Sequence, residues 1–346
     1  MVLRFAAASG LSAIALWLAS RNVQLNGLRS ALAGASLSWL LLYPIIAVIL
    51  NVGRGEIWRR LLRGRVTTTE AFWAYSIGFL ANNVLPFRIG EGVRVVALAK
   101  RRGLPVVEVL AAASLERLLD MAALALILAI VAPQVADVPG LASGAVLVVL
   151  LVAAMVTAIV VVTRYREPPP ALVDWCTRVL PQRFGRAIID RWRDLTQGLA
   201  VLLDPAIGIP TAAGALVVWV LSIVLQWLVL RAFQPQAGAL DASFMVAVIS
   251  LAIALPAAPG FVGVYHWAGQ QSLVQAFPHR YDPSTALAAA TVAHAAAYIT
   301  GTVIGLGGLW YYGMSLSTIV DAVHEGERRD LDTDPYVADR SASDIV

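Results

Sequence analysis

The stretch NNVLPFRIGEGVR, residues 82–94, places a proline, two glycines and three charged side chains inside a long apolar part of the chain. Proline removes a backbone donor and clashes with the preceding turn, so a helix running through this stretch is broken. Arg88, Glu91 and Arg94 then follow at three-residue spacing, which puts them on one face of a helix that begins near Gly90. A broken, charged helix at membrane depth must be enclosed by protein or line a wet cavity.

The composition around this stretch is that of an integral membrane protein. Hydrophobic residues make up 59% of the 346, charged residues 14%, and the mean hydropathy is +0.74. A soluble domain carries about 25% charged residues. The single cysteine, Cys176, excludes an intramolecular disulfide framework, a cysteine-rich zinc site and an iron–sulfur cluster. Because the four histidines also lack metal-ligand spacing, we expect no metal and no cofactor.

Hydropathy predicts an all-α polytopic fold with six full crossings of roughly 20 apolar residues each. They lie at 4–20, 31–50, 107–133, 142–163, 209–231 and 285–313. The first is expected to be retained as a helix, although a cleaved signal peptide is the alternative. Two further stretches, 70–100 and 241–277, are interrupted midway by proline and glycine. Their short halves predict re-entrant helix hairpins, or else tight pairs of short full spans. In either case the stretch begins and ends on the same side of the membrane.

The basic residues orient these spans. Five arginines lie in 51–65, three cations in 100–102 and seven arginines between Arg164 and Arg193, whereas 132–140 has no lysine or arginine. By the positive-inside rule the basic linkers are cytoplasmic and the bare one is outside. We therefore expect a multi-pass protein of the inner (plasma) membrane with both termini in the cytoplasm.

The chain divides into two similar halves, at about 4–133 and about 142–313. Each contains three crossings and one hairpin, so the second half is inverted relative to the first. Leu85-Pro86-x-x-x-Gly90 in the first hairpin has the same spacing as Leu255-Pro256-x-x-x-Gly260 in the second. Inverted repeats with broken helices at the midplane are typical of secondary transporters, with the substrate at the breaks. Proline kinks that only aid packing are the simpler alternative.

Two further segments are not part of the membrane-crossing helices. We predict one transmembrane domain over 1–313, with a cytoplasmic amphipathic helix at about 171–203 that lies on the leaflet or docks a partner. Residues 314–346 form an acidic tail that is too short and polar to fold alone, so we expect disorder there.

A second group of charges lies in LERLLD, in the span after the first hairpin. Glu116, Arg117 and Asp120 each cost about 3 kcal/mol at the bilayer centre if unpaired. We expect Glu91 and Arg94 to pair with this group across to the next helix. The group is then either a buried ion-pair cluster that only locks the hairpin in place or part of a binding site.

The chemistry that suits these residues is anion binding. Arg88 offers a planar fork for phosphate, and a helix that begins near Gly90 points backbone N–H groups at the same place. Asn82 and Asn83 add uncharged donors. The carboxylates of Glu91, Glu116 and Asp120 would either balance the arginines or carry protons. His266 lies beside the second break, whereas His294 is expected to be a hydrogen-bonded packing residue.

The residues from Asn82 to Asp120 resemble the signature of the lysylphosphatidylglycerol synthase transmembrane family, N-x-x-L-P-x-R-x-G-E-x-x-R followed by E-R-x-x-D. LPAAPGFVGVYH resembles the family's looser second motif, and the resemblance extends over roughly residues 5–313. It implies movement of an anionic or polyprenyl-linked lipid between leaflets. Many relatives carry a glutamate where this chain has His266, which puts an acid–base role there in doubt. Larger members append an aminoacyltransferase domain, so we do not expect this chain to make lysyl-lipid.

We therefore predict a lipid transporter and not an enzyme. The alternative is a membrane-embedded transferase, or an accessory subunit, acting on a lipid-linked sugar or phospholipid. Membrane lipids are the expected partners, nucleic acid is not, and a second copy or a lipid-modifying enzyme is a candidate protein partner. The predicted substrate-binding residues come from both hairpins and the span after the first, namely Asn82, Asn83, Arg88, Glu91, Arg94, Glu116, Arg117, Asp120, Pro259, Gly260, Gly263 and His266.

Overall fold

A computed structural model describes residues 2–21, 23–85, 88–135, 141–164, 173, 196, 198–254 and 258–315. Every regular element in these ranges is an α-helix or a short 3-10 helix. The prolines of the two predicted breaks, Pro86 and Pro256, lie outside the described residues. So do most of the predicted amphipathic helix at 171–203 and nearly all of the predicted tail.

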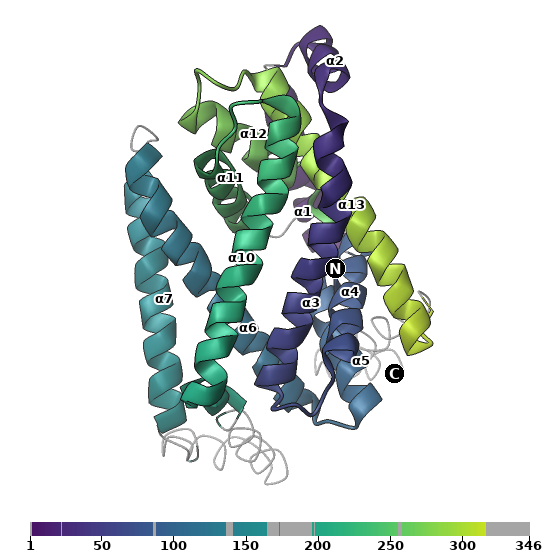
Figure 1. Ribbon diagram of the computed structural model, residues 1–346, viewed down its shortest axis with the longest axis vertical. Helices are drawn as coiled ribbons and strands as arrows, with labels where there is room; N and C mark the ends of the chain where they lie inside the picture. The colour runs from purple at the N-terminus through teal and green to yellow at the C-terminus, as the bar shows by residue number, and fades with distance from the viewer. Residues whose placement is uncertain are drawn as a thin grey trace, which may run out of the picture.

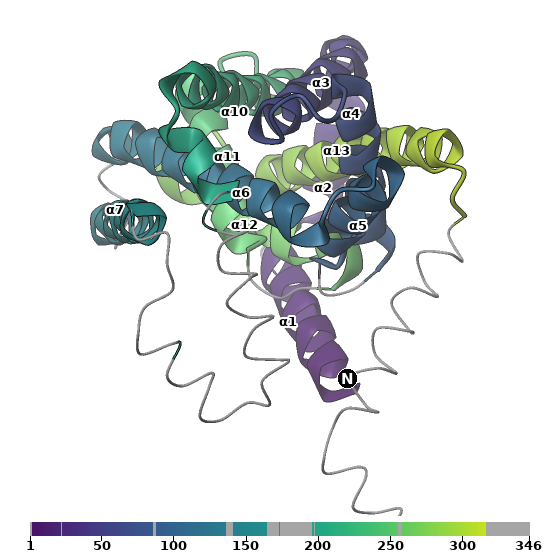
Figure 2. The same cartoon turned by 90° about the horizontal axis from the view of Figure 1, so that it is seen from below.

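The helices form one assembly whose long members run along its long axis (Figure 1). Seen from below, α1 and α7 stand at its margin (Figure 2). In chain order the elements are α1 (Val2–Ser20), α2 (Leu25–Gly34), η1 (Leu37–Leu42), α3 (Tyr43–Leu61), α4 (Thr68–Val84), α5 (Gly90–Arg102), α6 (Val106–Val131), η3 (Ala132–Val135), α7 (Leu141–Arg164), η4 (Ala200–Leu203), α10 (Pro205–Phe233), α11 (Ala239–Ala252), η5 (Pro259–Phe261), α12 (Val264–Ala276) and α13 (Pro283–Tyr312).

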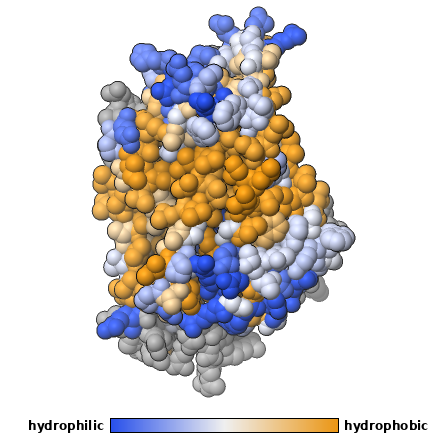
Figure 3. All heavy atoms as spheres, viewed as in Figure 1, coloured by the Kyte–Doolittle hydropathy of each residue, from blue (hydrophilic) through white to orange (hydrophobic). Residues whose placement is uncertain are grey.

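Among the described residues, four helical stretches are long and apolar enough to cross a membrane. They are Leu37–Leu61, Val106–Val135, Pro205–Phe233 and Pro283–Tyr312. On the face drawn in Figure 3 an apolar band lies between two hydrophilic ends, as a bilayer requires. Two of the predicted spans, 4–20 and 142–163, coincide with α1 and α7, whose described apolar stretches are shorter, at Ser9–Ser20 and Val146–Ala158. The chain is an all-helical membrane protein, and the crossings by α1 and α7 stay predictions.

The predicted span at 31–50 is wrong in its bounds. The short helix α2 ends at Gly34, and the apolar stretch then runs from η1 through α3 to Leu61. Residues 51–61, predicted as a cytoplasmic linker because of their arginines, are therefore helical. Arg54 and Trp58 in this segment are buried. A hydropathy window counts Arg54 as a solvated charge because it cannot register carboxylates supplied by a distant helix.

The first hairpin consists of α4 and α5, which pack antiparallel. Thr67 caps α4 in a reciprocal pair with Glu70, because the Glu70 N–H donates to Thr67 Oγ1 and the Thr67 N–H donates to the Glu70 carboxylate. A Cβ on Gly90 would lie 1.9 Å from the carbonyl oxygen of Gly78, so only glycine permits this approach of the two backbones. At the base of the hairpin, Arg102 Nη2 lies 2.6 Å from Glu70 Oε2 and joins the start of α4 to the end of α5.

The second hairpin consists of α11 and α12 and is closed in the same way. Asp241, in the first turn of α11, accepts from the Gly238 N–H. Arg280, just after α12, donates to both carboxylate oxygens of Asp241 at 2.5 and 2.6 Å, and the Tyr281 hydroxyl donates to Oδ2 at 2.9 Å. The first hairpin's base lies in the lower part of Figure 1, and α11 and α12 occupy the upper part.

The two hairpins meet tip to tip near the middle of the molecule. The Tyr298 hydroxyl, on α13, donates to the backbone oxygen of Asn83 at 3.3 Å. A Cβ on Gly260, which has φ +66°, would lie 2.8 Å from the Tyr298 ring and 3.5 Å from that same Asn83 oxygen. Asn83 Nδ2 in turn donates to Thr302 Oγ1 at 3.1 Å. The long helix α13 therefore joins the tip of the first hairpin to the tip of the second.

We expect the two hairpin bases to face opposite sides of the membrane. Single cysteines at the exposed positions Thr69 and Lys100 should react with an impermeant thiol reagent from one side, and cysteines at Gln236 and His279 from the other. The test is made in a Cys176→Ser background, in sealed vesicles of both orientations. Labelling of all four positions from the same side would contradict the opposed arrangement.

Candidate functional site

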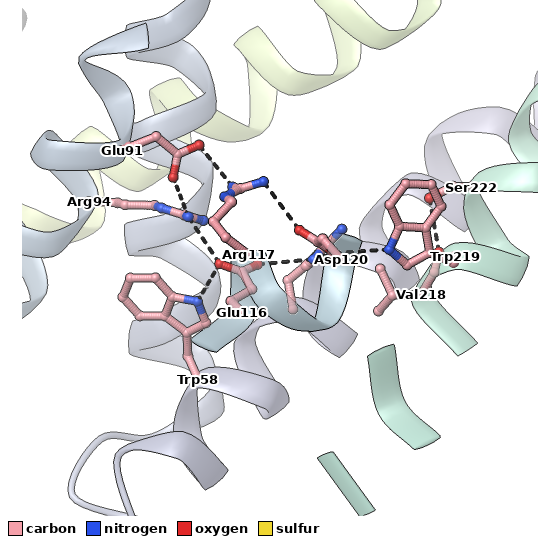
Figure 4. Close-up of polar contacts among 10 residues, drawn as sticks. Trp58, Glu91, Arg94, Glu116, Arg117, Asp120, Val218, Trp219 and Ser222 are labelled. Carbon is pink, nitrogen blue, oxygen red and sulfur yellow. Dashed lines mark hydrogen bonds and ion pairs between the residues drawn. The ribbon is translucent and has the colours of Figure 1, made fainter. Parts of the chain in front are cut away.

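The charged residues of α3, α5 and α6 converge on one buried carboxylate, that of Glu116 (Figure 4). Glu116 is 1% exposed. Its Oε1 lies 3.1 Å from Arg54 Nη1, and its Oε2 lies 3.0 Å from Arg94 Nη2. The indole N–H of Trp58 donates to Oε2 at 2.8 Å. Two guanidinium groups and one indole thus surround a carboxylate that would otherwise be strongly disfavoured at this depth.

A second carboxylate, Asp120, lies one turn further along α6. Its Oδ1 accepts from Arg54 Nη1 at 2.5 Å and from the indole N–H of Trp219 at 2.9 Å. Its Oδ2 accepts from Arg117 Nη1 at 3.2 Å. Since Trp219 belongs to α10, this carboxylate connects three helices, α3, α6 and α10.

The third carboxylate, Glu91, completes a closed ring. Glu91 pairs with Arg94 on its own helix, and its Oε1 lies 2.8 Å from Arg117 Nη2 on α6. Each acid therefore contacts two arginines and each arginine contacts two acids. We call this set the ion-pair ring. Its members, in the order of contact, are Arg94, Glu91, Arg117, Asp120, Arg54 and Glu116.

The ring is electrically balanced, with three positive and three negative side chains. Aromatic faces add to its stabilisation, because the Arg94 guanidinium lies 4.9 Å from the Trp58 ring centroid and 5.0 Å from that of Tyr75. The hydrogen bonding is not complete. The Nε atoms of Arg54, Arg94 and Arg117 are buried without a hydrogen-bond partner among the described residues.

The expected pairing of Glu91 and Arg94 with the next helix is present, through Arg117 and Glu116 respectively. Sequence reasoning missed Arg54, which it assigned to a cytoplasmic linker, and the two indoles. One signal for Arg54 was available. Trp58 lies four residues later and therefore on the same helical face, and in the structure both side chains donate to the Glu116 carboxylate.

Arg88 stands apart from the ion-pair ring, at the tip of the first hairpin. Its backbone is left-handed, with φ +56°. Its Nη1 donates to the backbone oxygen of Ile253 at 3.2 Å, and its guanidinium lies 5.6 Å from the Phe261 ring centroid. Both partners belong to the second hairpin. Arg88 is half-buried and forms no ion pair with any residue that the structure describes.

Asn82 and Asn83 bond to other parts of the protein, whereas they were expected to donate to an anion. Asn82 was predicted to donate to an anion, but its Oδ1 accepts the Gly90 N–H at 2.9 Å. The side chain therefore caps α5 and occupies a backbone donor that was predicted to face the anion. Asn83 does donate, but to the Tyr298 backbone oxygen and to Thr302 Oγ1 on α13. Both asparagines thus fix the tip of the first hairpin.

The described residues at the tip of the second hairpin are polar but uncharged. The Gly260 oxygen lies 2.7 Å from His294 Nε2, and because a carbonyl only accepts, that nitrogen carries the proton. The expected packing role of His294 agrees with this bond. The Gly263 N–H donates to His266 Nδ1 at 3.3 Å. Pro259 and Gly260 form the short helix η5, and Gly263, with φ +88°, precedes α12.

Aromatic contacts connect this tip to the neighbouring helices. The Tyr265 ring stacks on His294 at 4.7 Å between centroids, and the His266 ring lies edge-on to His294 at 4.8 Å. Gln226 Nε2, on α10, donates to the Tyr265 hydroxyl at 2.7 Å. The structure therefore brings the twelve predicted residues into two places, the ion-pair ring and the paired tips, with Arg88 in contact with the second tip.

The sequence is similar to a known family over most of its length. The family model described as the lysylphosphatidylglycerol synthase TM region matches residues 2–305. No curated protein matches the chain.

We expect Glu116→Gln to destabilise the protein strongly, because it leaves Arg54 and Arg94 facing a neutral partner in a buried site. Loss of one member of a buried ion pair costs about 3–5 kcal/mol. Glu56→Gln is the matched control, since Glu56 also contacts two arginines but is 30% exposed, and its loss should cost at most about 1 kcal/mol. Unfolding of both variants in mixed micelles measures the difference, and equal losses would show that the ring is not a stabilising element.

Proposed function

The chain belongs to the lysylphosphatidylglycerol synthase TM region family, and from this premise we propose that it moves an anionic lipid between the two leaflets. The observation that carries the proposal is Arg88, a cation without an ion-pair partner among the described residues, where the two hairpin tips meet. A phosphate group would supply the missing negative charge. The substrate class is therefore an anionic phospholipid or a polyprenyl-phosphate-linked lipid.

The proposed architecture is an inverted repeat with two opposed re-entrant hairpins. Three of the four hairpin helices have only 13 or 14 residues, which gives about 20 Å of length against a hydrocarbon core of about 30 Å. Each hairpin also has an acid in the first turn of its first helix, bound by an arginine from the end of its second helix. This repeated base supports the proposal that each hairpin enters and leaves on one side.

In this proposal Arg88 is the residue that binds the phosphate. Its guanidinium can present two parallel N–H groups to two phosphate oxygens, a geometry that lysine cannot provide. The hydrogen bond from the Arg88 guanidinium to the neutral Ile253 oxygen is a weaker interaction than an ion pair with a phosphate. A lipid phosphate can therefore replace it, while the acyl or prenyl chains stay in the bilayer.

The ion-pair ring supports this function by holding α5 in position. It ties the first turns of α5 to α3 and α6, so the backbone at the tip cannot shift without breaking paired charges. The rival proposal is a membrane-embedded transferase that uses these carboxylates as an acid–base pair. Because each carboxylate already accepts from two arginines, we favour a positioning role and a transporter that is not an enzyme.

The cellular setting follows from the charge distribution. We propose a location in the inner (plasma) membrane with both termini in the cytoplasm, as the basic linkers favour. A lipid-modifying enzyme or a second copy of the chain is the proposed protein partner. Neither is required for the lipid-binding step itself.

Arg88→Ala should slow lipid transport while the protein still folds and inserts. A charge-assisted hydrogen bond contributes about 1.5–3 kcal/mol, so the rate should fall about 10- to 100-fold. Arg88→Lys should lie between the variant and the wild type, because it keeps the charge and loses the fork. The measurement is movement of a labelled anionic lipid in liposomes that contain the purified protein.

The control for this experiment is Arg59→Ala, which removes an arginine that is paired with Glu56 away from the tips. Its transport rate should equal that of the wild type. Size-exclusion profiles and helical content establish that each variant has folded. Wild-type transport by a folded Arg88→Ala protein would exclude the proposed headgroup site.

A further inference from the structure

The charges at the paired tips also indicate which headgroup the site accepts. Resting on the proposed function, we infer that the site selects a lipid whose headgroup carries one negative charge, on a phosphodiester, and otherwise only uncharged hydrogen-bonding groups. Lipids with an amine on the headgroup are excluded. The inference depends on three features, namely the balance of the ion-pair ring, the single excess cation and the uncharged second tip.

The first feature is that the ion-pair ring has no charge to offer. Its three acids and three arginines contact one another in a closed cycle. Glu116 and Arg94 at its centre are 1% and 2% exposed. A headgroup amine would have to compete with two arginines for a carboxylate, and each of these arginines would then keep only one of its two acid partners. The ring is therefore a poor partner for a cationic ligand.

The second feature is that one cation remains. Among the described residues, Arg54, Arg88, Arg94 and Arg117 contact or adjoin only three carboxylates, and Arg88 is the arginine outside the ring. The described residues here therefore have an excess of one positive charge, which one phosphodiester neutralises.

The third feature is the chemistry of the second tip. No carboxylate among the described residues makes a contact with the polar side chains there, which are those of Ser12, Gln226, Tyr265, His266, His294 and Tyr298. An ammonium group entering this tip would find no negative partner. Burial of an unpaired ammonium is strongly unfavourable, so the second tip excludes amine-bearing headgroups.

The same tip still has hydrogen-bonding capacity for uncharged groups. Since His266 Nδ1 accepts from the Gly263 N–H, the ring proton of the neutral side chain lies on Nε2, which has no partner among the described residues. Gln226 Oε1 is buried and likewise without a partner there. One donor and one acceptor are thus available beside Tyr265, and hydroxyl groups can use both. A glycerol or sugar headgroup has such hydroxyls.

The test compares lipids with identical acyl chains in liposomes of phosphatidylcholine that contain the purified wild-type protein. The probes are labelled phosphatidylglycerol, phosphatidylethanolamine and lysylphosphatidylglycerol, which carry net charges of about −1, 0 and +1 at neutral pH. We expect phosphatidylglycerol to move at least about tenfold faster than either amine-bearing lipid. Equal rates for all three, each lost in Arg88→Ala, would overturn this inference and leave the proposed transport intact. No movement of these three probes or of a labelled polyprenyl phosphate would overturn the proposed function itself.

A charge placed at the second tip provides an independent test. His266→Glu introduces a carboxylate there, so the preference for phosphatidylglycerol over lysylphosphatidylglycerol should fall at least about tenfold. Gln275→Glu is the matched control, because it adds the same charge to α12 at an exposed position about 13 Å further along the helix. The lipid preference of this control variant should equal that of the wild type. An unchanged preference in a folded His266→Glu protein would contradict the inference. If that variant does not insert, the inference is tested by the ratio of the phosphatidylglycerol and lysylphosphatidylglycerol rates in the wild-type protein.

Discussion

The pairing of every charge in the ion-pair ring is the constraint on which the rest of the molecule depends. A single unpaired charge is strongly disfavoured at membrane depth, so the three acids and three arginines must keep their alternation. They come from α3, α5 and α6, and the indole of Trp219 extends the contacts to α10. The alternation therefore fixes the relative positions of four helices. It also fixes the start of α5, and with it the place where Arg88 emerges.

The helices α3 and α10 carry different polar residues at comparable positions. Arg54 on α3 and Gln226 on α10 each lie about two turns before the end of their helix. Arg54 binds two carboxylates, whereas Gln226 binds a tyrosine hydroxyl. The first half therefore concentrates charge, and the second half offers uncharged donors and acceptors. Such a division suits a ligand that is charged at one end of its headgroup and neutral at the other.

Local sequence predicted the features that depend on neighbouring residues. The spacing of Glu91 and Arg94 indicated one helical face, and apolar length located most of the long helices. The same prediction was wrong for Arg88, which precedes α5 and has a left-handed backbone. Prediction from local sequence failed where interacting residues are far apart in the chain. Arg54 is separated by 62 residues from Glu116, so a window centred on Arg54 contains several other arginines and only one acid, Glu56, and indicates a cytoplasmic linker. The direction of the Asn82 hydrogen bond was also missed, because an amide can donate or accept and only the position of Gly90 decides.

Each hairpin is fastened at its base and is also held at its tip by α13, which makes it a beam supported at both ends. The Glu70–Arg102 and Asp241–Arg280 contacts are the supports at the two bases. A beam of this kind passes a movement at one support on to the other, and α4, with 17 residues, is about 25 Å long. A rotation of roughly 5° at the base corresponds to about 2 Å at the tip for an arm of that length. Arg88 bonds the first hairpin to Ile253 of the second, so a small rotation at one base would press on the opposite hairpin through this contact.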